Sequence, residues 1–360
     1  MAQIWQSTYW PNFDYDRRQI EGPLARAQEA IGEIQGLQTG LSAADQQQIR
    51  FAQITAEALA SFGIEGVSLN AAQIEASVIA SLGHRDRAPL SRRSDAIAEL
   101  MIEARSGDLP LDEARLLSWH RLLFFGIEVE DPGRWRRFDI EIVRSAAAGS
   151  NDVLYKAPPP ERLQEDMRLF IDWLASPPDL PLAVTAGIAH LWFESIHPFS
   201  DGNGRIGRAI IEHVFACHRA LPFSLSRQIE REKKAYYAAL QEARREGQGA
   251  IDATPFLVWF LSCLTRAAEA GREEALFLVR RNAFFMRFAS LLSERQEKAF
   301  RLIFAHGPQR IAEGLTARSW RKLTGVSPAT ATRDLQALQQ VGVLRFAEAG
   351  GRSSAYEISV

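Results

Sequence analysis

Apolar residues recur at three- and four-residue intervals along most of this chain, which is the spacing of one helical face. The predicted helical stretches are 20–60 (two helices), 70–83, 95–106, 111–125 and about 160–270. Gly40 supplies a stop for the first helix, and Ser42 is a good N-cap for the second. The pattern therefore predicts a mainly α protein.

One segment departs from this period. Arg137–Arg144 (RFDIEIVR) alternates polar and apolar residues, and Val153–Tyr155 resumes the extended character after the turn residues Gly149–Asp152. We predict a β-hairpin within the helical region.

A different arrangement begins near residue 293. Three short helices are expected there, with the N-cap residues Ser293, Thr316 and Ser327. Gly325 gives a tight turn between the second and the third helix, and Val343–Phe346 with Ala355–Val360 predicts a small hairpin around a double glycine. This order is typical of a helix-turn-helix followed by a wing, that is, of a winged helix.

Length and composition are those of an ordinary globular protein of two or three domains, which we place at 1–90, 91–270 and 271–360. The two cysteines, Cys217 and Cys263, are too few for a disulfide framework or a metal cluster and fit a reducing cytoplasm. The most apolar run, Pro255–Leu264, has about half the length of a membrane-spanning helix. No signal-peptide pattern is present, so we expect a cytoplasmic protein with no membrane partner.

A glycine-rich loop between two apolar helices carries the candidate chemistry. It reads HPFSDGNGRIGR over 197–208, so Gly202-Asn203-Gly204 leads into a helix N-terminus. Glycines let the main chain approach a ligand, and the N–H groups of a helix N-terminus form an anion site. Arg205 and Arg208, three residues apart, add guanidinium groups suited to phosphates.

Two further residues of the loop complete a reaction centre. Asp201 offers the hard oxygen ligand that a Mg²⁺ ion bridging phosphates needs. His197 titrates near neutral pH and can act as a general base. Together these residues predict a phosphoryl or nucleotidyl transferase.

The same stretch resembles the signature of the Fic family (filamentation induced by cAMP), H-P-F-x-D/E-G-N-G-R-x-x-R, at every fixed position. The resemblance implies a helical Fic core that transfers AMP from ATP to a Ser, Thr or Tyr hydroxyl of a target protein, and to itself. It implies that His197 deprotonates the hydroxyl and that Asp201 holds Mg²⁺ on the α and β phosphates. Asn203, with the main chain around Gly202 and Gly204, would cradle phosphate oxygens, while Arg205 and Arg208 would hold the β and γ phosphates.

Two alternatives stay open for this loop. A degenerate Fic fold could bind nucleotide without chemistry. His190, Glu194 and His197 also share one helical face at a spacing that could hold zinc, although Pro198 ends the helix there and a metal would consume the base.

The predicted hairpin also fits this family, in which a β-hairpin flap docks the target segment by strand addition. Gly133-Arg134-Trp135-Arg136, just before it, resembles the family's entry into the flap. The alternative is a structural hairpin with no substrate contact. Tyr236 and Tyr237 are candidates for lining the nucleobase pocket, or ordinary core or surface aromatics.

A second motif lies upstream. Ser61, Glu65 and Gly66 match the Fic inhibitory pattern S/T-x-x-x-E-G/N, and residues 5–83 resemble the N-terminal domain often fused to Fic cores (the class II arrangement). The resemblance implies that Glu65 pairs with Arg208 and occupies the fork meant for the γ phosphate. The same glutamate could position water for removing AMP, and the alternative is a plain surface residue beside a helix C-cap.

The C-terminal module is mildly basic, with 10 Lys and Arg against 6 Asp and Glu from 291 to 360. Its candidate phosphate contacts are Arg318, Arg321, Lys322, Arg345 and Arg352. The predicted recognition helix, Ser327–Gln340, carries Arg333 as its one basic residue, with Asp334 beside it. The sequence leaves open whether this module binds DNA, another protein or a second copy of the chain. The alternative function is thus a nucleotide-sensing DNA-binding regulator with a Fic core.

Overall fold

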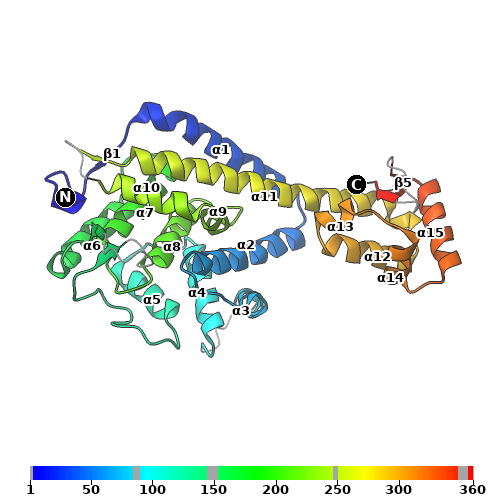
Figure 1. Ribbon diagram of the computed structural model, residues 1–360, viewed down its shortest axis with the longest axis horizontal. Helices are drawn as coiled ribbons and strands as arrows, with labels where there is room; N and C mark the ends of the chain where they lie inside the picture. Colours follow the sequence, from blue (N-terminus) through cyan, green and yellow to red (C-terminus); the bar gives the residue numbers. More distant parts are fainter. Residues whose placement is uncertain (1–2, 84–89, 144–152, 246–249, 348–355, 360) are drawn as a thin grey trace. The chain divides into compact units, whose positions relative to one another are not determined.

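The computed structural model describes residues 3–83, 90–143, 153–245, 250–347 and 356–359. They form two compact units, Met1–Arg272 and Glu273–Val360, and the boundary falls inside one long helix, α11. Residues 1–90, set apart as a domain on sequence grounds, belong to the same unit as the chain up to residue 272. Both units are mainly helical, which confirms the predicted fold class (Figure 1).

The first unit holds eleven named α-helices among its described residues. They are α1 (Arg17–Thr39), α2 (Ala43–Ile64), α3 (Ala71–Gly83), α4 (Arg93–Ala104), α5 (Glu113–Leu123), α6 (Pro160–Ala175), α7 (Leu182–Ile196), α8 (Asn203–Ala216), α9 (Leu225–Arg231), α10 (Lys233–Ala243) and α11 (Thr254–Phe288, which continues into the second unit). A short 3₁₀ helix, η1, spans Ile4–Gln6. None of the described helices is long and apolar enough to cross a membrane.

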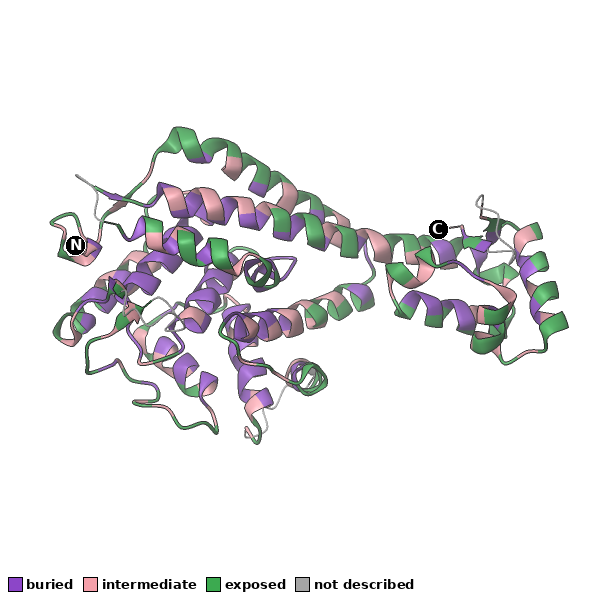
Figure 2. Cartoon of the chain, in the orientation of Figure 1, coloured by how far each residue is buried: buried purple, intermediate pink, exposed green. Residues whose placement is uncertain are grey.

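The core of this unit is built around α7. Every residue from Ala183 to Ile196 is buried, and most of them are apolar, as expected of a central helix. It packs against α8, and the two helices form much of the buried centre in Figure 2. On the outside, α1 lies along the first part of α11, where Arg272 pairs with Glu33 at 3.2 Å (Figure 1). The loop that joins α7 to α8 therefore starts and ends on two deeply buried helices.

Two small sheets complete the first unit. The predicted hairpin is present as β2 (Glu141–Val143) and β3 (Val153–Lys156), paired antiparallel; its predicted turn at 149–152 and Arg144 lie outside the described residues. The second sheet pairs β1 (Phe13–Asp14) with β4 (Ile251–Asp252) in parallel. Nothing in the alternation of the sequence predicted this pair, because strands of two residues are too short to show a period.

The second unit contains η3 (Ala289–Leu291), α12 (Glu294–Ala305), α13 (Pro308–Ala312), α14 (Ala317–Thr324), α15 (Pro328–Gln340), β5 (Leu344–Phe346) and β6 (Tyr356–Ile358). The predicted N-caps are confirmed, since the side chains of Ser293, Thr316 and Ser327 each accept a main-chain hydrogen bond. Gly325 ends α14 with a left-handed φ of 71°. Strands β5 and β6 pair antiparallel, and the expected double-glycine turn and Arg352 lie outside the described residues.

Candidate active site

His197 directly follows α7 in a left-handed conformation, with φ 52° and ψ 58°. Its main-chain N–H still donates to the oxygen of Phe193 at 2.9 Å, so α7 ends on this residue. A left-handed backbone costs a residue with a Cβ about 1–2 kcal/mol, and Pro198 excludes a continued helix. The turn brings the side chain out of the core, and 19% of it is exposed to solvent.

The buried guanidinium of Arg136 holds this turn in place. It donates to the carbonyl oxygens of His197 (2.8 Å) and Ile196 (3.4 Å), which a helix end leaves without partners. It also donates to Phe138 (2.7 Å) and Pro158 (2.6 Å), on either side of the β2–β3 hairpin. One side chain therefore links the hairpin to the end of α7. Arg136 belongs to the Gly133–Arg136 segment that resembles the entry into the flap, but its sequence context does not predict this role.

The imidazole of His197 is uncharged at neutral pH. Burial, with a further contribution from the positive charge of Arg244, lowers its pKa from the ordinary 6.5 to about 3. Its Nδ1 lies 3.4 Å from the main-chain oxygen of Glu194. A neutral imidazole is the form that can accept a proton, as a general base must.

The chain between His197 and α8 is braced from two sides. The side-chain amide of Asn203 accepts from the N–H of Phe199 and donates to its carbonyl, both at 2.9 Å. His120 accepts from the N–H of Gly133 at Nδ1 (2.8 Å), and its Nε2 contacts the carbonyl of Asp201 (3.2 Å). The His120 ring also stacks on Phe199 at 4.1 Å. The loop is thus fixed before any ligand is present. His120 could not be recognised from the sequence, since its hydrogen-bond partners are main-chain groups.

The first turn of α8 offers an anion site. Gly202 occupies the N-cap with a left-handed φ of 81°, and a Cβ there would lie 2.5 Å from Leu123. Within the described chain, no acceptor is present for the main-chain N–H groups of Asn203, Gly204 and Arg205. Free N–H groups at the positive end of a helix dipole bind phosphate oxygens.

Arg205 and Arg208 lie buried beside this turn, at 4% and 2% exposure. The guanidinium of Arg205 sits between the rings of Phe62 (5.3 Å) and Phe124 (5.1 Å) and contacts Asp201 at 3.1 Å. Asp201 itself is 62% exposed. A single accessible carboxylate suits Mg²⁺, which keeps several waters and takes its other ligands from substrate phosphates.

Arg208 already has a carboxylate partner. It donates to Glu65 Oε1 at 2.8 Å, and to the hydroxyl (3.0 Å) and carbonyl (2.7 Å) of Ser61. The predicted pairing of Glu65 with Arg208 is therefore confirmed. A Cβ built on Gly204 would meet Glu65 Oε1 at 2.5 Å, so the carboxylate lies directly on the glycine loop.

The end of α2 explains the glycine of this motif. Gly66 is left-handed, at φ 76°, and donates to the carbonyl of Gly63, while Val67 donates to that of Phe62. These two hydrogen bonds form a Schellman motif, which needs a residue that tolerates a positive φ. The stop places Glu65 at the last position before the chain turns away, with its side chain toward α8.

The alternative zinc set is not assembled. The Nε2 of the buried His190 lies 2.8 Å from the hydroxyl of Tyr236, whose ring is also buried. Among the described residues, no group of three or more metal-ligating side chains comes together. Tyr237, unlike Tyr236, is 42% exposed, and burial is the largest cause that raises its pKa to about 12.

Comparison with protein-family models gives two matches. Residues 110–215 match the Fic/DOC family, and residues 3–84 match a domain of unknown function, DUF4172. The chain carries a Fic/DOC domain. The matched segment runs from α5 through the flap to α8 and includes the whole loop from His197 to Arg208.

Curated relatives of the Fic domain are named as adenylyltransferases. A probable protein adenylyltransferase of Aquifex aeolicus (strain VF5), aq_aa38, is 29% identical over 141 residues, which is 39% of this chain and 38% of that protein. The protein adenylyltransferase Fic of Nematostella vectensis is 31% identical over 115 residues, which is 31% of this chain and 25% of that protein. The matches thus span less than two fifths of either relative.

Solved structures show the same fold. A Fic family protein from Desulfovibrio desulfuricans G20 aligns with a TM-score of 0.56 and 23% identity over 98% of both chains. A Fic domain containing signaling protein from Bacteroides thetaiotaomicron VPI-5482 aligns with a TM-score of 0.51 and 18% identity, over 69% of this chain and 97% of that one.

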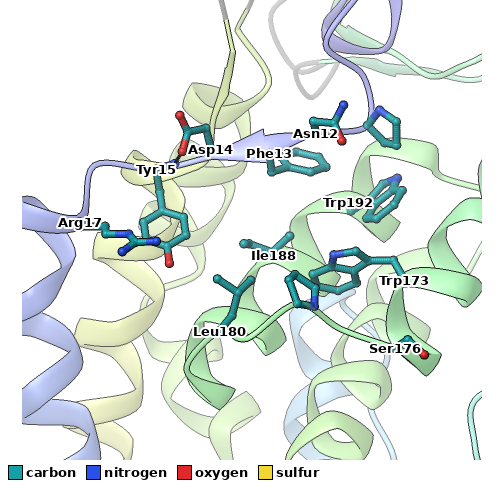
Figure 3. Close-up of a pocket in the computed structure, with 12 residues that line it drawn as sticks. Asn12, Phe13, Asp14, Tyr15, Arg17, Trp173, Ser176, Leu180, Ile188 and Trp192 are labelled. Atoms are coloured by element: carbon teal, nitrogen blue, oxygen red, sulfur yellow. Dashed lines mark hydrogen bonds between the residues drawn. The ribbon is translucent and has the colours of Figure 1, made fainter.

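A cavity of about 530 Å³ lies apart from the Fic loop. Figure 3 shows it between the N-terminal segment and α7, with Trp173 and Trp192 on one side and Tyr15 and Arg17 on the other. None of its lining residues comes from 197–208. The cavity therefore belongs to the junction between the two matched domains rather than to the reaction centre.

We predict that Arg136→Lys lowers the free energy of unfolding by about 3 kcal/mol, because buried carbonyls without a donor cost about 1–3 kcal/mol each and an ammonium cannot span all four. Thermal and urea denaturation would measure this. The matched control is Arg137→Lys, since Arg137 is 74% exposed and pairs with Asp131. An equal loss in both variants would contradict the role assigned to Arg136.

The buried histidines make stability depend on pH. Burial is the largest cause that lowers the pKa of His213 from 6.5 to about 4, so below pH 6.5 the unfolded chain binds a proton that the native protein does not. We expect His213→Phe, which keeps an aromatic ring against Trp119, to reduce the loss of stability between pH 6.5 and 4.5 by about 2 kcal/mol. Denaturation at both pH values measures this difference, and parallel curves for parent and variant would contradict it.

Proposed function

We propose that this protein transfers AMP from ATP to a Ser, Thr or Tyr hydroxyl of a target protein and of itself, and that Glu65 restrains this activity. The observation that carries the proposal is the loop itself. One braced segment joins a neutral His197, an exposed Asp201 and the free N–H groups at the start of α8. The adenylyltransferase names of the curated relatives support the same reaction.

The reaction needs one proton transfer and one exchange at phosphorus. The hydroxyl oxygen of the target attacks the α phosphorus, and its proton passes to His197. The bond between the α phosphorus and the bridging oxygen breaks, and pyrophosphate leaves. Asp201 would hold Mg²⁺, which neutralises phosphate charge when bound. The α8 N–H groups and Arg205 and Arg208 would bind the phosphate oxygens.

The flap supplies an edge for an extended target segment. Lys156 of β3 has both main-chain groups occupied, its N–H by Gln3 (3.1 Å) and its carbonyl by Trp5 (2.7 Å). In the register of the hairpin, Glu141 is the non-hydrogen-bonded partner of Lys156, so its main-chain groups point away from β3. We therefore place strand addition along β2, beside Val143, whose side chain is 48% exposed.

Glu65 would inhibit the reaction because its carboxylate takes the place of a phosphate group of ATP. Its carboxylate already occupies the fork of Arg208 that a terminal phosphate of ATP would use. A charge-assisted hydrogen bond contributes about 1.5–3 kcal/mol, or roughly 10- to 100-fold in an equilibrium. ATP that binds with Glu65 in place is held in a pose without this contact.

We expect Glu65→Gly to raise the initial rate of AMP incorporation from labelled ATP by about tenfold or more, because the fork of Arg208 is freed. Glu65→Gln should raise it less, since its amide oxygen still accepts from Arg208. His197→Ala should lower the rate by about 10²–10⁴-fold in the Glu65→Gly background. Intact mass would show one added AMP per site.

The control is Glu75→Gln, an exposed carboxylate on α3, which should leave the rate unchanged. Equal rates for the parent and Glu65→Gly would contradict inhibition by Glu65. Unchanged incorporation in His197→Ala would contradict the role of His197 as the base. Loss of AMP from an already modified sample, dependent on Glu65, would assign the reverse reaction to the same glutamate.

The second candidate function is DNA binding by the unit Glu273–Val360, and one observation favours it. Asp334, the acidic residue beside Arg333 on α15, accepts from Trp320 Nε1 (3.0 Å) and pairs with Arg295 (2.9 Å). Its charge is thus neutralised within the unit, which leaves Arg333 exposed. We expect Arg333→Gln to weaken a salt-sensitive gel shift, with Lys298→Gln on α12 as the control. No shift with the parent protein at low salt would remove this candidate.

A further inference from the structure

Both polar groups of Glu194 face the same ring nitrogen of His197. Glu194 lies one turn earlier on α7 and is buried, at 5% exposure. Its main-chain oxygen is 3.4 Å from His197 Nδ1, and its carboxylate oxygen Oε2 is 3.8 Å from the same atom. A proton on Nδ1 therefore faces two oxygen acceptors. An unprotonated Nδ1 would instead place its lone pair against the lone pairs of the same two oxygens.

Arg244 fixes the position of this carboxylate. Its NH2 donates to the main-chain oxygen of Glu194 at 2.5 Å and lies 3.6 Å from Oε2. Its Nε contacts the hydroxyl of Ser195 at 3.4 Å, and its guanidinium lies 4.8 Å above the ring of Tyr155, the flap residue that donates to the carbonyl of Ser195. The side chains of Glu194 and Arg244 thus form one buried pair beneath the base.

Only one of the two carboxylate oxygens of Glu194 takes part in this pair. In the described residues, Glu194 Oε1 has no hydrogen-bond partner, although the atom is buried. A Cβ built on Gly207 would lie 2.9 Å from it, so α8 packs directly against this oxygen. A buried, incompletely paired carboxylate costs stability compared with an apolar side chain, so structural support alone is a poor explanation for it.

We propose that Glu194 is a positioning residue for His197: its main-chain oxygen and its carboxylate hold the ring proton on Nδ1 and leave Nε2 as the atom that accepts the proton of the target hydroxyl. The ring orientation follows from the same contacts, since Nδ1 is directed toward α7. The inference rests on the proposed function for the identity of the hydroxyl, but the tautomer is a property of the free protein.

The carboxylate also matters for the charge that develops during the reaction. When Nε2 takes the proton, the imidazole becomes an imidazolium next to the positive charge of Arg244, which opposes protonation. Burial raises the pKa of Glu194, and the contact with Arg244 opposes that shift. In its charged form the carboxylate, 3.8 Å from Nδ1, would offset this repulsion. Glu194 would therefore stabilise the state in which the hydroxyl has lost its proton.

The variant Glu194→Gln keeps the size of the side chain and an acceptor for Arg244, but it removes the charge. Its amide can donate a hydrogen bond to Nδ1, which favours the tautomer with the proton on Nε2, and that tautomer cannot act as a base at Nε2. In the Glu65→Gly background we expect kcat for AMP transfer to fall about a hundredfold, with the Kd for ATP unchanged.

Imidazole nitrogen NMR gives a readout that requires no activity. In protein with labelled histidine, the signals of His197 are assigned by their loss in His197→Gln. We expect protonated Nδ1 and unprotonated Nε2 in the parent protein, and a gain of the Nε2-protonated form in Glu194→Gln. A purely structural role for Glu194 would lower the melting temperature without moving these signals.

The matched control is Glu212→Gln on α8. Glu212 is also a buried acidic side chain in contact with an arginine, at 2.7 Å from Arg105, and burial raises its pKa to about 8. Arg105 and its other partner, the carbonyl of Leu221, lie outside the loop. We expect it to change the melting temperature and to leave both the His197 signals and kcat as they are.

The outcomes separate the two hypotheses. If Glu65→Gly transfers no AMP while the His197 tautomer shifts in Glu194→Gln, the proposed function fails and the positioning role stands. If AMP is transferred, and Glu194→Gln alters neither the tautomer nor kcat beyond twofold, the positioning role is overturned and the proposed function stands. An equal fall of kcat and of ATP affinity, without a tautomer shift, also overturns it.

Discussion

The arrangement of this site depends on one buried guanidinium. Arg136 satisfies the last carbonyls of α7 and, with the same planar group, the carbonyls that flank the flap. A helix end inside a protein needs donors for its free oxygens, and a hairpin needs a fixed base. Because Arg136 meets both needs at once, the position of His197 and the position of the β2–β3 hairpin are coupled.

Helix α2, which ends at Glu65, is part of the same packed core. Glu57 of α2 is buried and accepts hydrogen bonds from Ser224 and Ser226 at the start of α9, and Phe62 is fully buried beneath Arg205. Removing α2 would thus expose a core helix and leave several charged groups without partners. Glu65, in contrast, is 29% exposed and sits at the C-cap. Displacement of one side chain, with the helix in place, is the low-cost way to free Arg208.

Whether the role of a residue could be predicted from the sequence depends on the type of partner that the residue has. The loop 197–208 and the Glu65–Arg208 pair could be predicted because both ends carry side chains in a recognisable spacing. The roles of Arg136, His120 and Asn203 could not, because their partners are main-chain atoms brought together only by folding. The pairing of β1 with β4 was not predicted for a related reason, since main-chain pairing of two-residue strands leaves no pattern of side chains in the sequence. The division into domains stays a prediction, as does the winged-helix assignment.

Several unfavourable features of the described residues lie on α7, on α8 and in the turn between them. His197 is left-handed, its partly buried ring lies near the positive charge of Arg244, and several buried polar atoms of the two helices lack partners among the described residues. These atoms include His190 Nδ1, Glu194 Oε1, Arg205 Nε and Arg208 NH1. All belong to α7 and α8, the two helices that the loop connects. A core selected only for stability would replace them with apolar side chains. Arg205 Nε and Arg208 NH1 are hydrogen-bond donors beside the N-terminus of α8, so the oxygens of a phosphate-bearing ligand would supply interactions that the free protein lacks.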